Sequence, residues 1–139
     1  LTHRRTVWFI DRRFFVIADE AFGTDEGEVA LHYNLVECDP AEDFAACSAA
    51  TRFGDGNDLL LKVFGAERME RREGWVSRTY RQRSERPAYA FTVRKRAGEP
   101  VRLVTVLLPV ADAAAQRIEA AWRGDRLQVK IDGKRYDLK

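Results

Sequence analysis

The chain has 139 residues, of which 45% are hydrophobic and 33% charged, with nine Gly, four Pro and a formal net charge of +2. This composition is typical of one ordinary folded domain and excludes disordered, collagen-like and disulfide-scaffold proteins. The longest apolar runs, at residues 7–10, 14–18 and, with Thr105 inside it, 104–108, are far shorter than the roughly 18 residues of a membrane-spanning helix, so we expect no membrane partner.

Two apolar runs near the start of the chain predict a β-hairpin. Residues 7–10 (Val-Trp-Phe-Ile) and residues 14–18 (Phe-Phe-Val-Ile-Ala) are strong β-formers, and Asp11, Arg12 and Arg13 separate them. Continuous apolar runs are typical of strands that are covered on both faces. We therefore expect this hairpin to be buried on both faces near its centre.

Further strands are predicted along the middle of the chain. Residues 29–36 place Val, Leu, Tyr and Leu at alternate positions, which indicates a half-buried strand. Residues 59–64 alternate in the same way after turn-forming residues at 54–57. Residues 101–108 form another predicted strand, which Pro109 ends.

The last thirty residues predict two successive hairpins. Apolar residues stand at every second position of residues 118–122, and Gly-Asp follows at 124–125. They do so again in residues 127–131, which Asp-Gly follows at 132–133, a preferred two-residue loop. The Ala-rich residues 111–121 also fit one short helix capped by Asp112, and this alternative stays open. Strands at about ten-residue spacing predict an all-β fold: a single domain over residues 1–139, built as an antiparallel β-sandwich of roughly nine strands.

Charge is divided into two opposed blocks. Residues 11–43 carry a net charge of −8, and residues 68–96 carry a net charge of +7, most of it from Arg. The planar Arg side chain donates in pairs to carboxylate, sulfate or phosphate, so the basic block suits an acidic polymer as partner. The alternative is that the two blocks neutralise each other in the folded sheet.

The ends and the cysteines add two expectations. The chain begins without Met and shows no signal peptide, so we expect a piece of a longer protein. Cys38 and Cys47 are the only cysteines, and their spacing favours two unpaired thiols while leaving a disulfide open. Without a Cys-x-x-Cys or His-rich ligand set, a structural zinc site is not expected. We predict no metal and no other cofactor for this chain.

Five segments occur in an order that carries a family resemblance. They are residues 3–10 (His-Arg-Arg-Thr-Val-Trp-Phe-Ile), 14–19 (Phe-Phe-Val-Ile-Ala-Asp), 28–35, 75–80 (Trp-Val-Ser-Arg-Thr-Tyr) and 105–109 (Thr-Val-Leu-Leu-Pro). Over nearly its whole length the chain resembles the C-terminal β-sandwich part of heparinase II/III-like polysaccharide lyases. One position departs from the pattern, because the aromatic-His-Leu of the family stands here as Tyr33-Asn34-Leu35, with a histidine at His32.

The resemblance implies a function for the whole protein. Enzymes of this family join a helical toroid to β-sheet domains and cleave uronate-containing polysaccharides by β-elimination. The catalytic base and acid lie mainly in the toroid, and no stretch of this chain matches the family's metal motif. The resemblance therefore implies a non-catalytic sandwich with no metal of its own. It also implies an upstream α/α-toroid and an acidic polysaccharide as partners, and a secreted or periplasmic location.

The strongest candidate for substrate binding lies in the basic block. An aromatic ring can stack on a sugar while Arg side chains hold its carboxylate or sulfate. The alternative places the tryptophan in the core and the arginines in a solvated loop before Pro87. The predicted substrate-binding residues are Trp75, Arg78, Tyr80, Arg81 and Arg83.

Two histidines complete the candidates. His3 could contact an acidic sugar, although a hydrogen bond to a carboxylate such as Asp19 is the favoured interpretation. His32 and Asn34 share one strand face and suit a polar pair on the wetter side of the sheet. A metal site of His3, Asp19 and His32 is disfavoured, because their spacing is not a known ligand pattern.

The sequence offers two alternatives to a lyase domain. An independent carbohydrate-binding module is suggested by Trp75, Tyr80 and Trp122 among arginines. A nucleic-acid partner is not expected, because no helix-turn-helix, RNA-binding aromatic signature or zinc finger is present.

Overall fold

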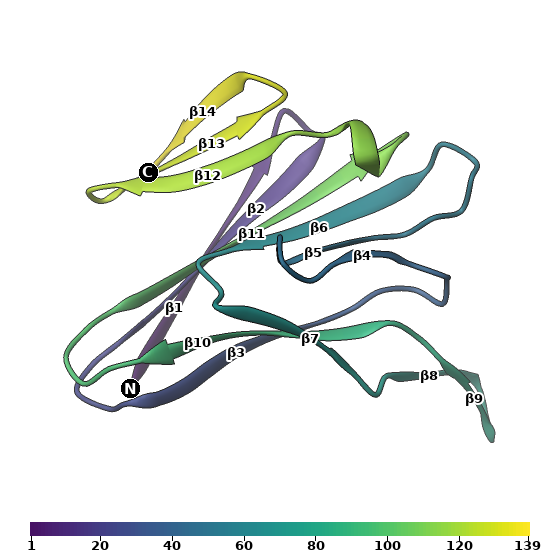
Figure 1. Cartoon of the computed structure of the whole chain (residues 1–139), viewed down its shortest axis with the longest axis horizontal. Helices are drawn as coiled ribbons and strands as arrows, with labels where there is room; N and C mark the ends of the chain where they lie inside the picture. Colours follow the sequence, from purple (N-terminus) through teal and green to yellow (C-terminus); the bar gives the residue numbers. More distant parts are fainter.

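The computed structural model describes all 139 residues, and nearly all of its regular structure is antiparallel β-sheet (Figure 1). No helix has the length and apolar character that crossing a membrane requires. The elements are β1 (Thr2–Ile10), β2 (Phe14–Phe22), β3 (Gly27–Asn34), β4 (Ala41–Asp43), β5 (Ser48–Ala50), β6 (Asp58–Phe64), β7 (Arg68–Arg72), β8 (Trp75–Thr79), β9 (Gln82–Glu85), β10 (Ala88–Lys95), β11 (Val101–Val110), the 3-10 helix η1 (Ala113–Ala115), β12 (Ile118–Arg123), β13 (Arg126–Ile131) and β14 (Lys134–Leu138).

The strands form one large sheet and three small ones. The central sheet has six strands in the order β1-β2-β11-β6-β5-β4. Two three-stranded sheets, β3-β10-β7 and β12-β13-β14, pack against it, and β8 and β9 form a separate two-stranded hairpin. In Figure 1 the β12-β13-β14 sheet lies over one end of the central sheet and the β3-β10-β7 sheet over the other.

The two small sheets cover opposite faces of the central sheet, and each encloses its own core. Successive side chains of a strand point to opposite faces. In β11, Val104 and Val106 belong to the core under β12-β13-β14, whereas Leu103 belongs to the core under β3-β10-β7. In β6, Leu60 belongs to the core under β12-β13-β14 and Leu61 to the core under β3-β10-β7. The predicted antiparallel sandwich is therefore confirmed, with the central sheet as the shared layer.

The local turn signals predicted the hairpins correctly. β1 and β2 pair from Ile10 and Phe14 outward, with Asp11 and Arg12 at positive φ in the turn. β12, β13 and β14 form the two C-terminal hairpins, and Asp132 (φ 49°) occupies a left-handed turn position that Asp tolerates.

The number of strands is higher than the predicted nine. Most of the additional strands, among them β4, β5 and β9, have only three to five residues and lack an apolar alternation, so periodicity gave no signal for them. The helical alternative for residues 111–121 reduces to the single turn η1, which Asp112 caps by accepting a hydrogen bond from the Ala114 amide. The strand alternative for residues 118–122 is confirmed by β12.

The expectation that the first hairpin is buried on both faces is wrong. Phe14 and Val16 are fully buried, but Val7, Phe9 and Phe15 point to the other face and are exposed. β1 is an edge strand, and the β3-β10-β7 sheet covers only part of this face.

The preference for unpaired thiols is confirmed, because Cys38 and Cys47 are both free.

Candidate functional site

The β8–β9 hairpin carries all five residues of the predicted basic site. The chain enters it through Gly74, where a Cβ atom would lie 2.6 Å from the Ala88 Cβ and 2.8 Å from the Arg86 carbonyl oxygen, so only glycine fits. The Arg86 amide donates to the Gly74 carbonyl at 3.0 Å and closes the base of the hairpin. Arg81 (φ 62°) turns the chain between the two strands. Figure 1 shows the hairpin extending away from the layered sheets.

Exposed aromatic rings and guanidinium groups alternate on this hairpin. Trp75 is 40% exposed and Tyr80 is 83% exposed, which excludes the alternative that Trp75 belongs to the core. The Arg83 guanidinium carbon lies 4.3 Å from the Trp75 ring centroid, and the Arg81 guanidinium carbon lies 5.3 Å from the Tyr80 ring centroid. Both distances are within the range of cation–π attraction. The hairpin thus presents two preassembled aromatic–arginine pairs to solvent.

Arg78 has a different environment from the other two arginines. Its Nε donates to Glu37 Oε1 at 3.0 Å and its Nη2 donates to Oε2 at 2.7 Å, which is a bidentate pair. The hydrogen bond from Arg78 lowers the pKa of Glu37 to about 2 and raises the pKa of Arg78. This pair ties the hairpin to the segment between β3 and β4. Arg81 and Arg83 form no ion pair, and each lies over an aromatic ring of the hairpin instead.

The two charge blocks neutralise each other in part. Ion pairs join Arg68 to Glu28, Arg71 to Glu42 and Arg78 to Glu37, each linking the basic block to the acidic block. The alternative that the blocks compensate each other is therefore confirmed for these three arginines. The positive charge that remains unpaired includes Arg81 and Arg83, at the end of the hairpin.

His3 is the second residue of β1, and the N-terminal end of this strand lies apart from the β8–β9 hairpin (Figure 1). Its Nε2 lies 2.6 Å from Asp19 Oδ1, as the favoured sequence interpretation predicted. Arg5 Nε donates to the same oxygen at 2.7 Å, and Asp19 is only 4% exposed. The structure therefore does not bring His3 together with the other predicted site residues.

The remaining polar candidates do not form a site. His32 and Asn34 are exposed and lie on one face of β3, as predicted. His3, Asp19 and His32 do not converge, and no group of three His, Cys, Asp or Glu side chains is close enough to hold a metal ion.

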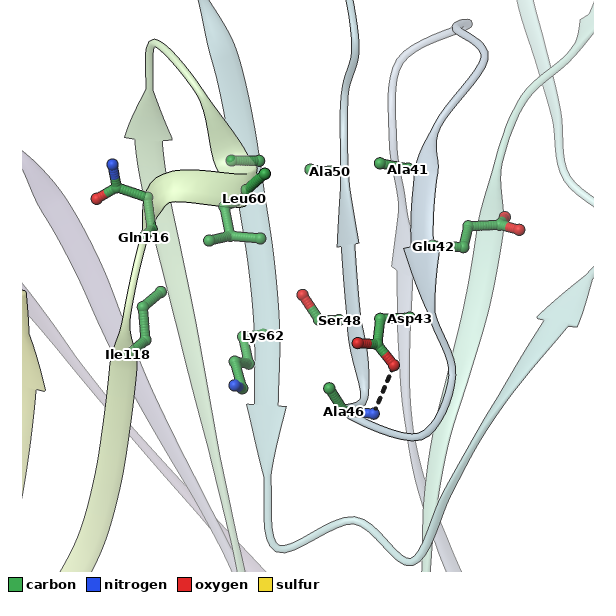
Figure 2. Close-up of a pocket in the computed structure, with 12 residues that line it drawn as sticks. Ala41, Glu42, Asp43, Ala46, Ser48, Ala50, Leu60, Lys62, Gln116 and Ile118 are labelled. Carbon is green, nitrogen blue, oxygen red and sulfur yellow. Dashed lines mark hydrogen bonds between the residues drawn. The ribbon is translucent and has the colours of Figure 1, made fainter.

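A hollow of about 300 Å³ lies between β4, β5 and β6 and the η1 segment. Figure 2 shows the residues that line it. Its lining is mainly alanine and aliphatic, with Asp43, Ser48 and Lys62 among the polar groups. Asp43 already accepts a hydrogen bond from the Ala46 amide at 3.0 Å. Glu42, also in the lining, accepts hydrogen bonds from Arg71 and from the Tyr89 hydroxyl, so both carboxylates of this hollow are already engaged within the chain.

Sequence reasoning named Trp122 as a candidate for carbohydrate binding but missed its arginine partner. The Arg102 guanidinium carbon lies 4.5 Å from the Trp122 ring centroid, in a recess of about 280 Å³ that Trp8 also lines. Glu20 fixes the pair by accepting hydrogen bonds from Arg102 Nε at 3.0 Å and from Arg4 Nε at 2.8 Å. The strand register was the missing signal, because Glu20 stands directly opposite Arg4 and Arg102 on the neighbouring strands.

Comparison with known families decides the relationship. Residues 1–121 match the family described as Heparinase II/III-like, C-terminal. The chain belongs to this family. The match confirms the resemblance found in the strand motifs, and it covers both the first hairpin and the β8–β9 hairpin.

Characterised relatives agree with the family and extend well beyond this chain. The chain is 34% identical to a heparin-sulfate lyase of Bacteroides stercoris, over 99% of the chain but 22% of the relative. It is 31% identical to a heparin-sulfate lyase of Pedobacter heparinus, over 85% of the chain and 18% of the relative. A solved heparinase III structure superposes with a TM-score of 0.91 at 35% identity and covers 98% of the chain and 23% of its own length. The chain thus spans about a fifth of these relatives.

Proposed function

We propose that this chain is the C-terminal sandwich of a polysaccharide lyase that cleaves uronate-containing acidic polysaccharide by β-elimination. In this proposal the sandwich supports or lines the substrate groove and is not catalytic alone. The observation that carries the proposal is the exposed Trp75–Arg83 pair, on a domain that is 34% identical to a heparin-sulfate lyase over nearly its whole length. An α/α-toroid preceding the sandwich is the proposed partner in the same chain.

The chemistry of the hairpin suits an acidic sugar. The free donors of Arg81 and Arg83 can hold a carboxylate or a sulfate, and the exposed Trp75 and Tyr80 rings offer apolar surfaces for a sugar ring. A β-elimination base needs a neighbour that favours proton removal. Tyr80 lies in the turn between β8 and β9, whereas the His3 ring is held by Asp19 on β1 and β2, so these two residues do not form a base and acid pair around a sugar on the hairpin.

A lyase assay tests this proposal. The whole product of the gene and the 139-residue chain are each incubated with heparan sulfate and other uronate polymers, and unsaturated products are followed by ultraviolet absorbance. We expect activity only from the whole product. Release of unsaturated sugar by the 139-residue chain would refute the non-catalytic role, and an inactive whole product would refute the lyase assignment.

A second candidate is an independent carbohydrate-binding module. The 83% exposure of Tyr80, beside the unpaired Arg81, favours it, because an exposed ring is available without any other domain. Glycan-array binding by the 139-residue chain separates the two candidates, since a domain that only supports the groove binds little alone.

Either candidate leads us to propose a secreted or periplasmic location, because acidic polysaccharides of this kind occur outside the cytoplasm. Cell fractionation tests this location.

A further inference from the structure

The open part of the central sheet carries an exposed apolar surface. Val7 (53% exposed) and Phe9 (57%) on β1 and Phe15 (41%) on β2 point to the same face. The Phe9 and Phe15 rings stack with their centroids 4.5 Å apart and their planes at 20°. Aromatic and β-branched residues at neighbouring strand positions are typical of a covered sheet face, yet nothing in this chain covers them.

The apolar surface continues across the sheet. Phe15 pairs with Leu107 of β11, and two positions further along β11 Pro109, on the same face, pairs with Leu59 of β6. Leu59 and Pro109 line a hollow of about 270 Å³ whose wall includes two further exposed apolar side chains, Val36 and Phe53. We call the whole set the open apolar face: Val7, Phe9, Phe15, Val36, Phe53, Leu59, Leu107 and Pro109.

The same side of the central sheet is covered elsewhere. Leu61, Val63 and Leu103 lie under the β3-β10-β7 sheet, in the second core. Leu107 packs at the border of that core and also adjoins Phe15. The open apolar face is therefore a continuation of an existing interface between layers, and it begins where the β3-β10-β7 sheet ends. A second layer over it would complete the sandwich at the usual spacing of packed sheets.

We propose that the open apolar face is the docking surface for the part of the longer chain that precedes this domain. The relatives extend far beyond the segment that this chain matches, since it covers only 18–22% of them, and the family description places that segment at the C-terminus. The occupant is an element of the preceding polypeptide with an aliphatic or aromatic face. This inference rests on family membership and on the length of the relatives, and it does not depend on the lyase chemistry.

Thiol labelling of Val7→Cys tests the docking surface. Cys38 and Cys47 are replaced by Ser, and maleimide labelling of Val7→Cys is compared between the 139-residue chain and the whole gene product. We expect the whole product to react more slowly by about tenfold or more, because the docked element excludes the reagent. Arg126→Cys, exposed on β13, is the matched control and reacts at one rate in both forms.

Several outcomes would overturn this inference. Equal labelling of Val7→Cys in both forms shows that nothing docks on the open apolar face. Concentration-dependent protection in the 139-residue chain, with a dimeric mass by light scattering, assigns the face to a second copy of the chain instead. If the Cys-to-Ser background does not fold, hydrogen exchange of the β1 and β2 amides in the unmodified proteins makes the same comparison. Protection of the face in a whole product without lyase activity would refute the proposed function and leave the docking surface intact.

Discussion

The sandwich buries its aromatic rings, whereas the β8–β9 hairpin exposes residues of the same type. In the sandwich, aromatic rings such as Phe14 and Phe91 are fully buried in two cores. In the hairpin, Trp75 and Tyr80 stay exposed and guanidinium groups lie over their rings. The difference shows that residue type alone does not separate a core from an exposed aromatic surface. What separates them is whether a second layer covers the strand.

The largest expected effect is on the sandwich core. Phe91→Ala removes a fully buried ring and should lower the free energy of unfolding by about 3–5 kcal/mol, measured by urea denaturation. Phe9→Ala is the matched control, because its ring is 57% exposed, and it should cost about 1 kcal/mol or less. Equal losses for the two variants would contradict the description of a covered and an open part of the sheet.

A smaller effect is expected at the buried carboxylate of β2. Asp19→Ala removes the acceptor of hydrogen bonds from His3 and Arg5 and should cost about 1–3 kcal/mol. Asp39→Ala removes an ion pair between exposed side chains and should cost about 0.5 kcal/mol or less. Thermal unfolding of both variants makes the comparison, and an unchanged transition for Asp19→Ala would show that its network adds nothing to stability.

Substitutions in the β8–β9 hairpin should weaken ligand binding without lowering the stability of the fold. The double variant Trp75→Ala/Arg83→Gln should unfold at the wild-type urea concentration. Its affinity for acidic oligosaccharide, in the whole gene product, should fall about tenfold, or about 1.4 kcal/mol. Arg126→Gln loses one positive charge on an exposed strand and should bind like wild type. An equal loss for the double variant and Arg126→Gln would mean that net charge, and not this pair, attracts the ligand.

The smallest expected effect is electrostatic. Glu37 should titrate near pH 2 in wild type, because Arg78 holds its carboxylate, and Arg78→Gln should return the pKa toward its ordinary value of 4.5. A carboxyl group with a lowered pKa stabilises the fold above its unfolded pKa. That contribution is lost as the pH falls through the folded value. Carbon-detected NMR titration measures both values, and a wild-type pKa near 4.5 would show that the ion pair does not persist in solution.

Local signals predicted the hairpins of this fold well. Asp132-Gly133 and the residues between β1 and β2 mark turns whose chemistry depends on a few adjacent residues. The order of the central sheet could not be read in this way, because β2 pairs with β11 across about eighty residues. Short, charged strands such as β9 carry no periodic signal.

The candidate site was predicted by residue type but not by contacts. The basic block correctly indicated an exposed aromatic–arginine surface, and the alternation of charges correctly indicated internal neutralisation. The sequence could not show that Glu37 engages Arg78 while Arg81 and Arg83 stay unpaired, because that choice depends on where the β3–β4 segment passes. The register of β1 and β2 contained a usable signal, since a turn centred on Arg12 places Arg4 opposite Glu20.

The most direct test of the central claim is the steady-state kinetics of Arg83→Gln in the whole gene product on an acidic polysaccharide. If the hairpin holds substrate while the chemistry occurs in another part of the chain, KM rises several-fold and kcat stays at the wild-type value. A kcat that falls with an unchanged KM would place Arg83 in the chemical step. Wild-type values for both constants would show that the hairpin does not touch the substrate.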